Sequence, residues 1–416
     1  MSGELTDHLG RPRIVVTGMG IKCPGGTDLE TVWSTVRAGK SVAAPIRQFD
    51  ATPLEVRFAC EVPDFDPEAY FGPKDVRRQD RVTHLGYAAA ADAIEQAGDL
   101  AADPERIAVV AATGVGGLNT LEENTHIFYE KGPSRVSPFF VPMMMPNATA
   151  GVISMRYGFT GPAFCVSTAC AAGTNAIGEG MRLIRDGSSD VVVAGGTEAF
   201  TAVTVAAFAR MGALSKRNDD PTSASRPFDA ERDGFVIAEG AAFVVLESLE
   251  RALGRGVEIF GEVAGYGRNS DAYHITAPSP GGVGAARCMS LALADAGLAP
   301  DEIGHINAHG TSTPLNDAAE AEAIRKVFGD AAPPVTGPKG VLGHMIGGAG
   351  AAEALLSLLI LRDGVLPPTA NLTTIADDIG LDVVHGAERP VSADPAISNS
   401  FGFGGHNASL VLRRVV

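Results

Sequence analysis

The strongest constraint on the fold is an internal repeat. Ala93–Val110 and Leu293–Asn307 share one order of features, in which a helix end and Ala-Gly precede a proline-acidic turn and a strand. Leu183–Gly187 and Leu359–Gly364 each end a helix pattern in Arg-Asp-Gly. The members of each pair lie about 180 to 200 residues apart. Alternating strands and helices that occur twice predict two α/β halves of the same plan.

The repeat also indicates where one half ends and the next begins. We expect the junction near Arg251 to Val257, which gives domains of residues 1–253 and 254–416. The apolar content of 45% supplies a substantial core, and the 50 glycines suit close-packed layers of helices and strands.

Composition argues against several classes of protein. The five cysteines form no CxxC motif, so we expect reduced thiols and a cytoplasmic location. The polar start of the chain lacks the apolar segment of a signal peptide, and the aliphatic runs are too short to span a bilayer. The formal charge of −16 is unfavourable for nucleic-acid binding. We therefore expect neither a membrane nor a nucleic-acid partner.

Local patterns predict the elements of the first half. Arg13–Thr17 has the pattern of a strand, after which we expect a glycine turn at Gly18–Gly20 and a loop-rich segment to about Pro73. A helix is predicted over Val82–Ala97. Gly132–Pro146, with four prolines, is expected to be an irregular apolar loop at a binding site or an interface.

A cysteine lies at a predicted strand–helix corner. The apolar segment Phe164–Val166 leads to Ser167 and Thr168, either of which can cap a helix expected from about Ala169 to Arg185. Cys170 would then lie in the first turn, where free N–H groups and the helix dipole favour a thiolate and depress its pKa. Taken alone, a single cysteine is more often an inert core residue.

Three segments of the second half carry polar side chains at matching strand and helix ends. Asn307–Pro314 ends a strand, Pro338–His344 leads into a helix of small residues, and Asn399–Asn407 links the last two strands. A duplicated fold can bring such ends together with the Cys170 corner across a pseudo-twofold axis. Each histidine or lysine in them, considered singly, is more often a satisfied core or surface residue.

As a set, these motifs resemble those of the β-ketoacyl-acyl-carrier-protein synthases, the condensing enzymes of the thiolase fold. The resemblance extends from Ile14 to Leu412 and is strongest to the type II elongating enzymes of fatty-acid synthesis. It implies a thiolase-like α/β fold in which two duplicated halves stack in αβαβα layers. His406 departs from the family pattern, since many relatives have threonine there.

The resemblance implies a catalytic set. It assigns catalysis to Cys170, His309, His344 and Lys339. Cys170 would receive the acyl chain as a soft nucleophile, and the two imidazoles would stabilise the enolate formed when malonyl loses carbon dioxide. The backbone N–H groups of Cys170 and Phe403 would form the oxyanion hole. Glu353 and Phe401 would support the site.

Other positions match family residues that bind substrate or the carrier protein. By this resemblance, Val115 would lie at the mouth of the acyl pocket, and Phe140 and Phe208 would form its walls. His274, Thr276, Thr311 and Thr313 would bind the pantetheine arm of the carrier protein, which completes the implied substrate-binding set. Three basic clusters would dock an acidic carrier protein, namely Lys74, Arg77 and Arg78, then Lys131 and Arg135, and finally Lys216 and Arg217.

The resemblance also implies partners. Acyl carrier protein would deliver both substrates, and the chain would form a homodimer in which Pro138–Met145 reaches the partner's pocket. No cofactor is implied, and no catalytic metal is expected because HExxH and clustered zinc-ligand spacings are absent from the sequence.

Alternatives remain open at this point. A ketosynthase of a type II polyketide or other secondary pathway would share the chemistry. A catalytically inactive chain-length subunit is disfavoured by the intact cysteine and histidines. A degradative thiolase would need a second catalytic cysteine, and Cys288, in a predicted helix, is the only other one in the second half.

Overall fold

The structure is a computed structural model that describes residues 5–415. Residues 1–4 and 416, the outer ends of the two predicted domains, lie outside the described residues. Within that range, the main sheet has ten strands in the order β10-β9-β13-β14-β8-β1-β7-β6-β4-β5. Each half supplies five of them. The strands are β1 (Ile14–Lys22), β4 (Ile107–Ala112), β5 (Ala163–Val166), β6 (Val191–Glu198), β7 (Gly240–Ser248), β8 (Gly261–Ser270), β9 (His305–Asn307), β10 (Val335–Thr336), β13 (Ala396–Gly402) and β14 (His406–Arg413).

The two halves have one topology. Numbered along the chain within each half, the strands lie in the order third, second, fourth, fifth, first. In both halves the second strand is parallel to the third and fourth, whereas the fifth is antiparallel to its neighbours. β1 and β8 pair antiparallel and join the halves. The predicted duplication is confirmed. The boundary expected after residue 253 falls within helix α9 (Leu249–Arg255) and stays a prediction.

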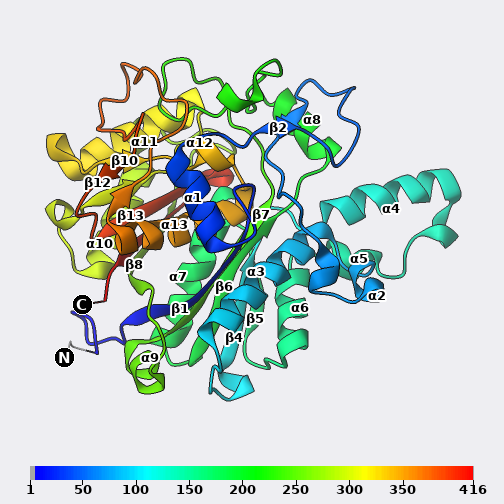
Figure 1. The fold of residues 1–416 in the computed structure, drawn as a ribbon, viewed down its shortest axis with the longest axis horizontal. Coiled ribbons are helices and arrows are strands. Elements are labelled where there is room, and N and C mark those ends of the chain that lie inside the picture. The colour runs from blue at the N-terminus through cyan, green and yellow to red at the C-terminus, as the bar shows by residue number, and fades with distance from the viewer. Residues whose placement is uncertain (1–4, 416) are drawn as a thin grey trace.

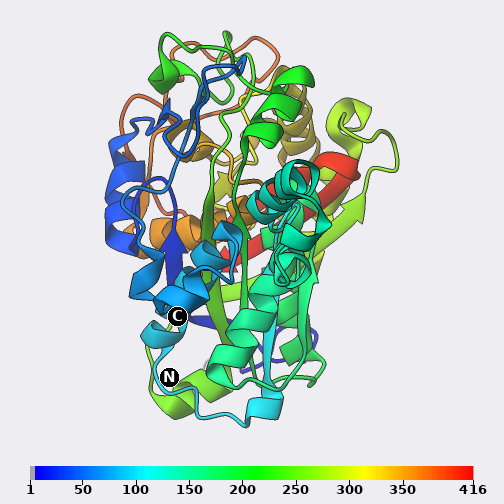
Figure 2. The same ribbon diagram turned by 90° about the vertical axis from the view of Figure 1, so that its right-hand side faces the viewer.

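Helices form layers on both sides of each half-sheet. α3 packs on β1 and β7, while α10 packs on β8, β14 and α11. α7 and α13 contact each other and strands of both halves, so they form the central layer (Figures 1 and 2). The main helices are α1 (Leu29–Ala38), α2 (Pro73–Val76), α3 (Arg81–Ala97), α4 (Leu118–Lys131), α5 (Phe140–Met144), α6 (Ala148–Tyr157), α7 (Ala172–Arg185), α8 (Ala202–Arg210), α10 (Val283–Ala296), α11 (Pro314–Phe328), α12 (Lys339–Leu342) and α13 (Ala349–Asp363).

Short elements complete the fold. Two small two-stranded sheets pair β2 (Ala44–Pro45) with β3 (Phe58–Ala59) and β11 (Val365–Leu366) with β12 (Arg389–Pro390). In the part of the chain that the structure describes, no helix is long and apolar enough to cross a membrane.

The glycine turn expected at Gly18–Gly20 is wrong. β1 continues to Lys22 through a register shift between Val16 and Gly18. The glycines serve close packing instead, since a Cβ at Gly18 would lie 2.1 Å from the Ala93 carbonyl oxygen of α3. A residue without a side chain therefore lets the helix lie directly on the strand.

Two segments expected to be irregular contain helices. The loop-rich stretch before Pro73 includes α1, which Asp28 caps by accepting from Thr31 N, and which buries Trp33 against the core. The apolar segment Gly132–Pro146 includes a 3₁₀ turn, η3 (Pro133–Arg135), and the helix α5. With α4, it projects from the body in Figure 1 and faces the viewer in Figure 2.

Candidate active site

Cys170 lies where the edge strand β5 meets the central layer. It is in a 3₁₀ turn, η4 (Ala169–Ala171), directly before α7 rather than in that helix's first turn. The predicted caps are wrong, because Ser167 donates to the Gly114 carbonyl and Thr168 donates to the Asn175 side chain. Ala169 has a left-handed φ of 49°, so the backbone turns sharply just before Cys170.

Both predicted histidines face this cysteine. His309 follows β9, and His344 lies between α12 and the 3₁₀ turn η9 (Ile346–Gly348). One ligand atom from each histidine and the Cys170 sulfur all lie within 4.8 Å of one another, and all three residues are buried. The rings of His309 and His344 are nearly perpendicular, with centroids 5.4 Å apart. One metal ion could be held by such a cluster, so the expected absence of a metal stays a prediction.

Lys339 fixes the protonation pattern of His309. Its Nζ donates to Glu353 Oε1 at 2.5 Å and to the His309 carbonyl at 2.6 Å, and it lies 3.3 Å from His309 Nδ1. An ammonium group can only donate, so Nδ1 of a neutral His309 must accept. The ring proton is then on Nε2.

His344 has free hydrogen-bonding capacity. Neither of its ring nitrogens has a partner among the described residues, although the side chain is buried. Its backbone is fixed, since its N–H donates to the Val236 carbonyl and its carbonyl accepts from Ala238. The ring also packs edge-on against Phe235 at 5.3 Å. An unpartnered buried imidazole calls for a partner that binds there.

The loop after β13 closes on Cys170. A Cβ at Gly402 would lie 3.0 Å from the Cys170 nitrogen, so only glycine lets the two backbones approach this closely. The Phe403 N–H is directed at the Cys170 thiol. Phe401 stacks edge-on against His309 with ring centroids 6.1 Å apart. His406 begins β14 beside this loop, and a Cβ at Gly404 would lie 3.0 Å from its ring.

Burial decides the charge states. It raises the pKa of Cys170 to about 11, although Lys339 and the Phe403 N–H lower it. The predicted depressed pKa is therefore wrong for this site, because desolvation outweighs the nearby positive charge. Burial and Lys339 hold the pKa values of His309 and His344 well below 6.5, so both are neutral at pH 7. Burial raises the pKa of Glu353 to about 7, which Lys339 opposes.

Aromatic residues form one side of the site. Phe208 from α8 lies 5.4 Å from Phe235 and 6.4 Å from Phe403, measured between ring centroids. Val115, after β4, is 52% exposed. Phe140 lies half-buried in α5, which packs on α4. The structure thus brings Phe208 to the loop that carries Phe403. Val115 lies just before α4, and Phe140 lies in α5, which packs on α4.

The expected pantetheine residues lie on two loops. Thr311 and Thr313 share a hydrogen bond of 2.9 Å between their hydroxyls. His274 Nδ1 accepts from the backbone of Thr276 at 3.1 Å. The Ile275 carbonyl between them accepts from Gly404, so this loop adjoins the one that carries Phe403.

The basic clusters differ in their surroundings. Arg78 lies over the Phe139 ring at 4.9 Å, which brings α2 together with the start of α5. Lys216 instead pairs with Glu55 at 2.6 Å, and Arg217 lies near two acidic residues. The remaining members are Lys74 on α2, Arg77 after it, Lys131 at the end of α4 and Arg135 in η3.

Two further residues support the site and were missed in the sequence. Glu320 of α11 accepts from the backbone N–H of His309 at 2.7 Å and of Gly310 at 2.8 Å. Phe235 packs on His344, as described. Glu320 could have been found from the sequence, because it is a carboxylate in the helix that directly follows the His309 loop. Phe235 lies on a loop far from His344 in the sequence, so no local pattern marks it.

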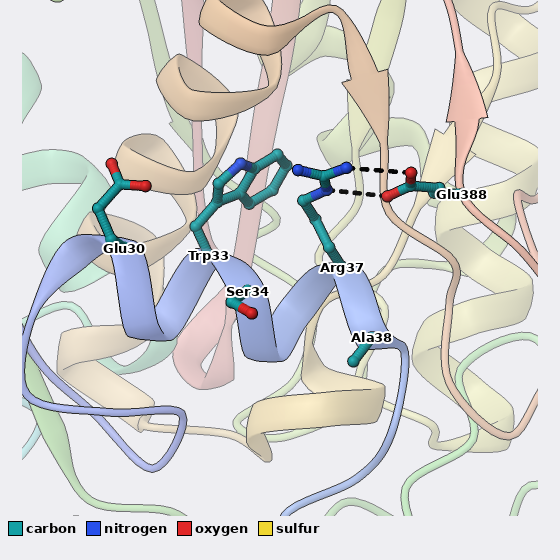
Figure 3. Close-up of a pocket in the computed structure, with 6 residues that line it drawn as sticks. All are labelled: Glu30, Trp33, Ser34, Arg37, Ala38 and Glu388. Atoms are coloured by element: carbon teal, nitrogen blue, oxygen red, sulfur yellow. Dashed lines mark hydrogen bonds and ion pairs between the residues drawn. The ribbon is translucent and has the colours of Figure 1, made fainter.

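A pocket of about 360 Å³ lies elsewhere, on the outer side of α1 (Figure 3). Arg37 lies over the Trp33 ring and makes two hydrogen bonds to Glu388. The pocket shares no residue with the Cys170 site, and we assign it no ligand. Its lining residues are Glu30, Trp33, Ser34, Arg37, Ala38 and Glu388.

Comparisons with known proteins cover the chain almost completely. The family model described as "Beta-ketoacyl synthase, N-terminal domain" matches residues 11–252, and the C-terminal domain model matches residues 260–373. A 3-oxoacyl-[acyl-carrier-protein] synthase 2 of Synechocystis sp. is 45% identical over 98% of this chain and 99% of its own length. The Vibrio cholerae protein of the same name is 43% identical over 98% and 100%.

Solved structures of ketosynthases have the same fold as this chain. The ishigamide ketosynthase/chain length factor has a TM-score of 0.92 at 37% identity, covering 98% of this chain and 100% of that one. A type II polyketide synthase acyl-carrier protein in complex with its ketosynthase has a TM-score of 0.90 at 30% identity, with coverage of 98% and 100%. The chain belongs to the β-ketoacyl synthase family of condensing enzymes and has their thiolase-like fold.

Proposed function

We propose that this protein is a 3-oxoacyl-[acyl-carrier-protein] synthase that elongates fatty acids by decarboxylative condensation. One observation carries the proposal. A buried thiol and two neutral imidazoles lie within 4.8 Å of one another, and one imidazole has no partner for either ring nitrogen. Such a site can bind an acyl group and then donate hydrogen bonds to a thioester oxygen.

Acyl transfer uses Cys170. Its sulfur attacks the thioester carbonyl of the acyl carrier protein, and the oxyanion accepts hydrogen bonds from the N–H groups of Cys170 and Phe403. The carbon–sulfur bond to the carrier then breaks, and the carrier thiol leaves with the proton that Cys170 gives up. Because burial raises the pKa of Cys170 to about 11, this proton must be removed as substrate binds, and a neutral imidazole lies within reach.

Condensation uses the histidines. The bond to the malonyl carboxylate breaks, carbon dioxide leaves, and the electron pair forms a thioester enolate. His309 donates from Nε2, the position that Lys339 leaves protonated, and His344 donates from one of its free ring nitrogens. The enolate carbon attacks the acyl carbonyl, the bond to the Cys170 sulfur breaks, and the thiolate takes up one proton from solvent, which the condensation consumes. The product is a 3-oxoacyl carrier protein.

An acidic acyl carrier protein would dock on the basic residues of α2, α4 and η3. Arg78, which follows the α2 helix that carries Lys74, lies over Phe139 and so links this face to the projecting arm of α4 and α5. Lys216 and Arg217 are weaker candidates because acidic side chains already neutralise them.

A second copy of the chain would cover the β5 edge. β5 ends the main sheet, and an unpaired edge is a template for another strand. The second copy would also bury exposed apolar side chains of β5, α6 and the projecting arm of α4 and α5, namely Phe128, Tyr129, Val141, Met145, Met155 and Phe164. The free cysteines fit the expected cytoplasmic location.

The polyketide alternative is less favoured. The relatives named 3-oxoacyl-[acyl-carrier-protein] synthase 2 reach 41–45% identity, whereas the solved polyketide ketosynthase complex named above reaches 30%. The decisive experiment mixes the protein with a saturated acyl carrier protein and malonyl carrier protein, and identifies the product by mass. A 3-oxoacyl product two carbons longer is expected. No condensation with saturated primers, together with turnover of a poly-oxo primer, would contradict the fatty-acid role.

A further inference from the structure

Glu198 is a buried carboxylate at the junction of the two halves. It is the last residue of β6, and its side chain makes three hydrogen bonds to groups outside that strand. Oε2 accepts from Gly114 N at 2.7 Å and from Gly347 N at 3.0 Å, while Oε1 accepts from the Thr113 hydroxyl at 3.0 Å. Within residues 5–415 it has no ion pair. Its charge is therefore held by backbone dipoles from both halves.

The two amides belong to segments that border the reaction site. Gly114 precedes Val115 at the proposed acyl-pocket mouth. Gly347 lies in η9, three residues after His344, and η9 packs directly on η4, the turn that carries Cys170. Glu198 thus connects the pocket mouth to η9, which in turn packs on the Cys170 turn.

The backbones at Gly114, Gly196 and Gly347 lie against one another with no side chain between them. A Cβ at Gly347 would lie 2.4 Å from Gly114 N, and one at Gly196 would lie 2.2 Å from the Gly347 oxygen. Ile346, directly before Gly347, has a left-handed φ of 41°, which is unfavourable for a β-branched residue. The hydrogen bond from the next amide to Glu198 offsets that strain and holds the turn.

Glu198 also acts on the thiol through its charge. It is among the groups that raise the pKa of Cys170, against the opposing field of Lys339. The Glu198 charge also contributes to the raised pKa of Cys165. Burial raises the pKa of Glu198 to about 7, so its charge is lost as pH falls below neutrality.

We propose that Glu198 is a positioning residue that holds the acyl-pocket mouth and the turn after His344 in register around Cys170. Its carboxylate also contributes negative potential at the thiol, against the field of Lys339. This inference deepens the proposed function, on which its acyl-transfer consequence rests. The effect on the thiol does not depend on that function.

Two variants separate the roles. Glu198→Gln keeps an oxygen that can accept from Gly114 and Gly347, and its amide can donate to Thr113, but it removes the charge. Glu198→Ala removes all three hydrogen bonds. Glu262→Gln is the matched control, because Glu262 is equally buried and pairs with Arg13 and Arg413 on outer strands.

Loading of Cys170 from an acyl carrier protein, followed by intact mass, tests the positioning role. Glu198→Ala should slow loading on the order of 10- to 100-fold, as for a displaced reacting group. Glu198→Gln should stay within about threefold of the wild type, since its hydrogen bonds persist. Glu262→Gln should load at the wild-type rate, which separates positioning from a general loss of stability. Wild-type loading by Glu198→Ala, or equally slow loading by Glu262→Gln, would overturn the positioning role.

Alkylation of Cys170 by iodoacetamide needs no substrate and tests the charge. The ratio of the Glu198→Gln rate to the wild-type rate should be near one at pH 6, where Glu198 is protonated. At pH 9 the ratio should exceed about two, because removing a negative charge increases the thiolate fraction. A ratio that is the same at both pH values would overturn the effect of the Glu198 charge on the thiol. This test needs neither a folded Glu198→Ala protein nor any assumption about the reaction that the enzyme catalyses.

Discussion

Replacing Lys339 by methionine should damage both the stability and the chemistry of the site. Lys339 is the only described hydrogen-bond partner of the Glu353 carboxylate, whose second oxygen has none. Breaking a buried ion pair by removing one partner typically costs about 3–5 kcal/mol. The same substitution frees His309 Nδ1, so the ring proton is no longer confined to Nε2. Losing an aimed donor slows such reactions by about 100- to 1,000-fold.

The assay combines thermal unfolding with carbon dioxide release from malonyl carrier protein. Adding Glu353→Gln to Lys339→Met should recover part of the lost stability, because the amide removes the cost of burying an unpaired carboxylate or of protonating it, but should not recover decarboxylation. Lys22→Met is the matched control, because Lys22 is also buried and paired, with Asp92 at 2.5 Å, outside the site. It should lower stability and leave decarboxylation unchanged. A Lys339→Met protein that releases carbon dioxide at the wild-type rate, or a double variant less stable than the single one, would refute this reasoning.

Three further outcomes are expected. Because burial raises the pKa of Cys170 to about 11, its alkylation rate should rise about tenfold per pH unit from pH 7 to 10, and a plateau below pH 8 would contradict the raised pKa. Since both site imidazoles titrate well below 6.5, decarboxylation by a Cys170→Ala protein should stay constant from pH 8 to pH 6, and a tenfold fall over that range would show an imidazole protonating. Reversing Lys74 and Arg78 to glutamate should raise KM for carrier-bound substrate and weaken its salt dependence more than Lys216→Glu does, because Lys216 already pairs with Glu55; equal effects would remove the α2 patch from the docking proposal.

The repeat was the most informative part of the sequence for the fold. Helix ends and strands that recur in the same order reflect a topology that both halves share, so the duplication could be predicted. Gly18 could not be interpreted correctly, because a glycine that opens a turn and one that admits a helix against a strand look alike locally. α1 was missed because its signal is a short cap and one buried face, including Trp33, within a proline-rich region.

For the site, spacing and resemblance predicted which residues gather around Cys170 but not their environment. Cys170, His309 and His344 were predicted from motifs far apart in the chain, and the structure brings them together. The pKa of Cys170 was predicted in the wrong direction, because burial depends on what packs over the residue and not on its neighbours in sequence. Glu198 had no sequence signal, since its partners Gly114 and Gly347 lie in different halves.

The central claim is a division of labour in which Cys170 receives the acyl chain and the histidines stabilise the enolate. The most direct measurement follows both half reactions in two variants, with covalent acylation recorded by mass and carbon dioxide release recorded from malonyl carrier protein. Cys170→Ala should lose acylation and retain some uncoupled decarboxylation, whereas His344→Ala should still be acylated and should release carbon dioxide on the order of 100-fold more slowly. A His344→Ala protein that decarboxylates at the wild-type rate, or a Cys170→Ala protein that still becomes acylated at the same peptide, would contradict the claim.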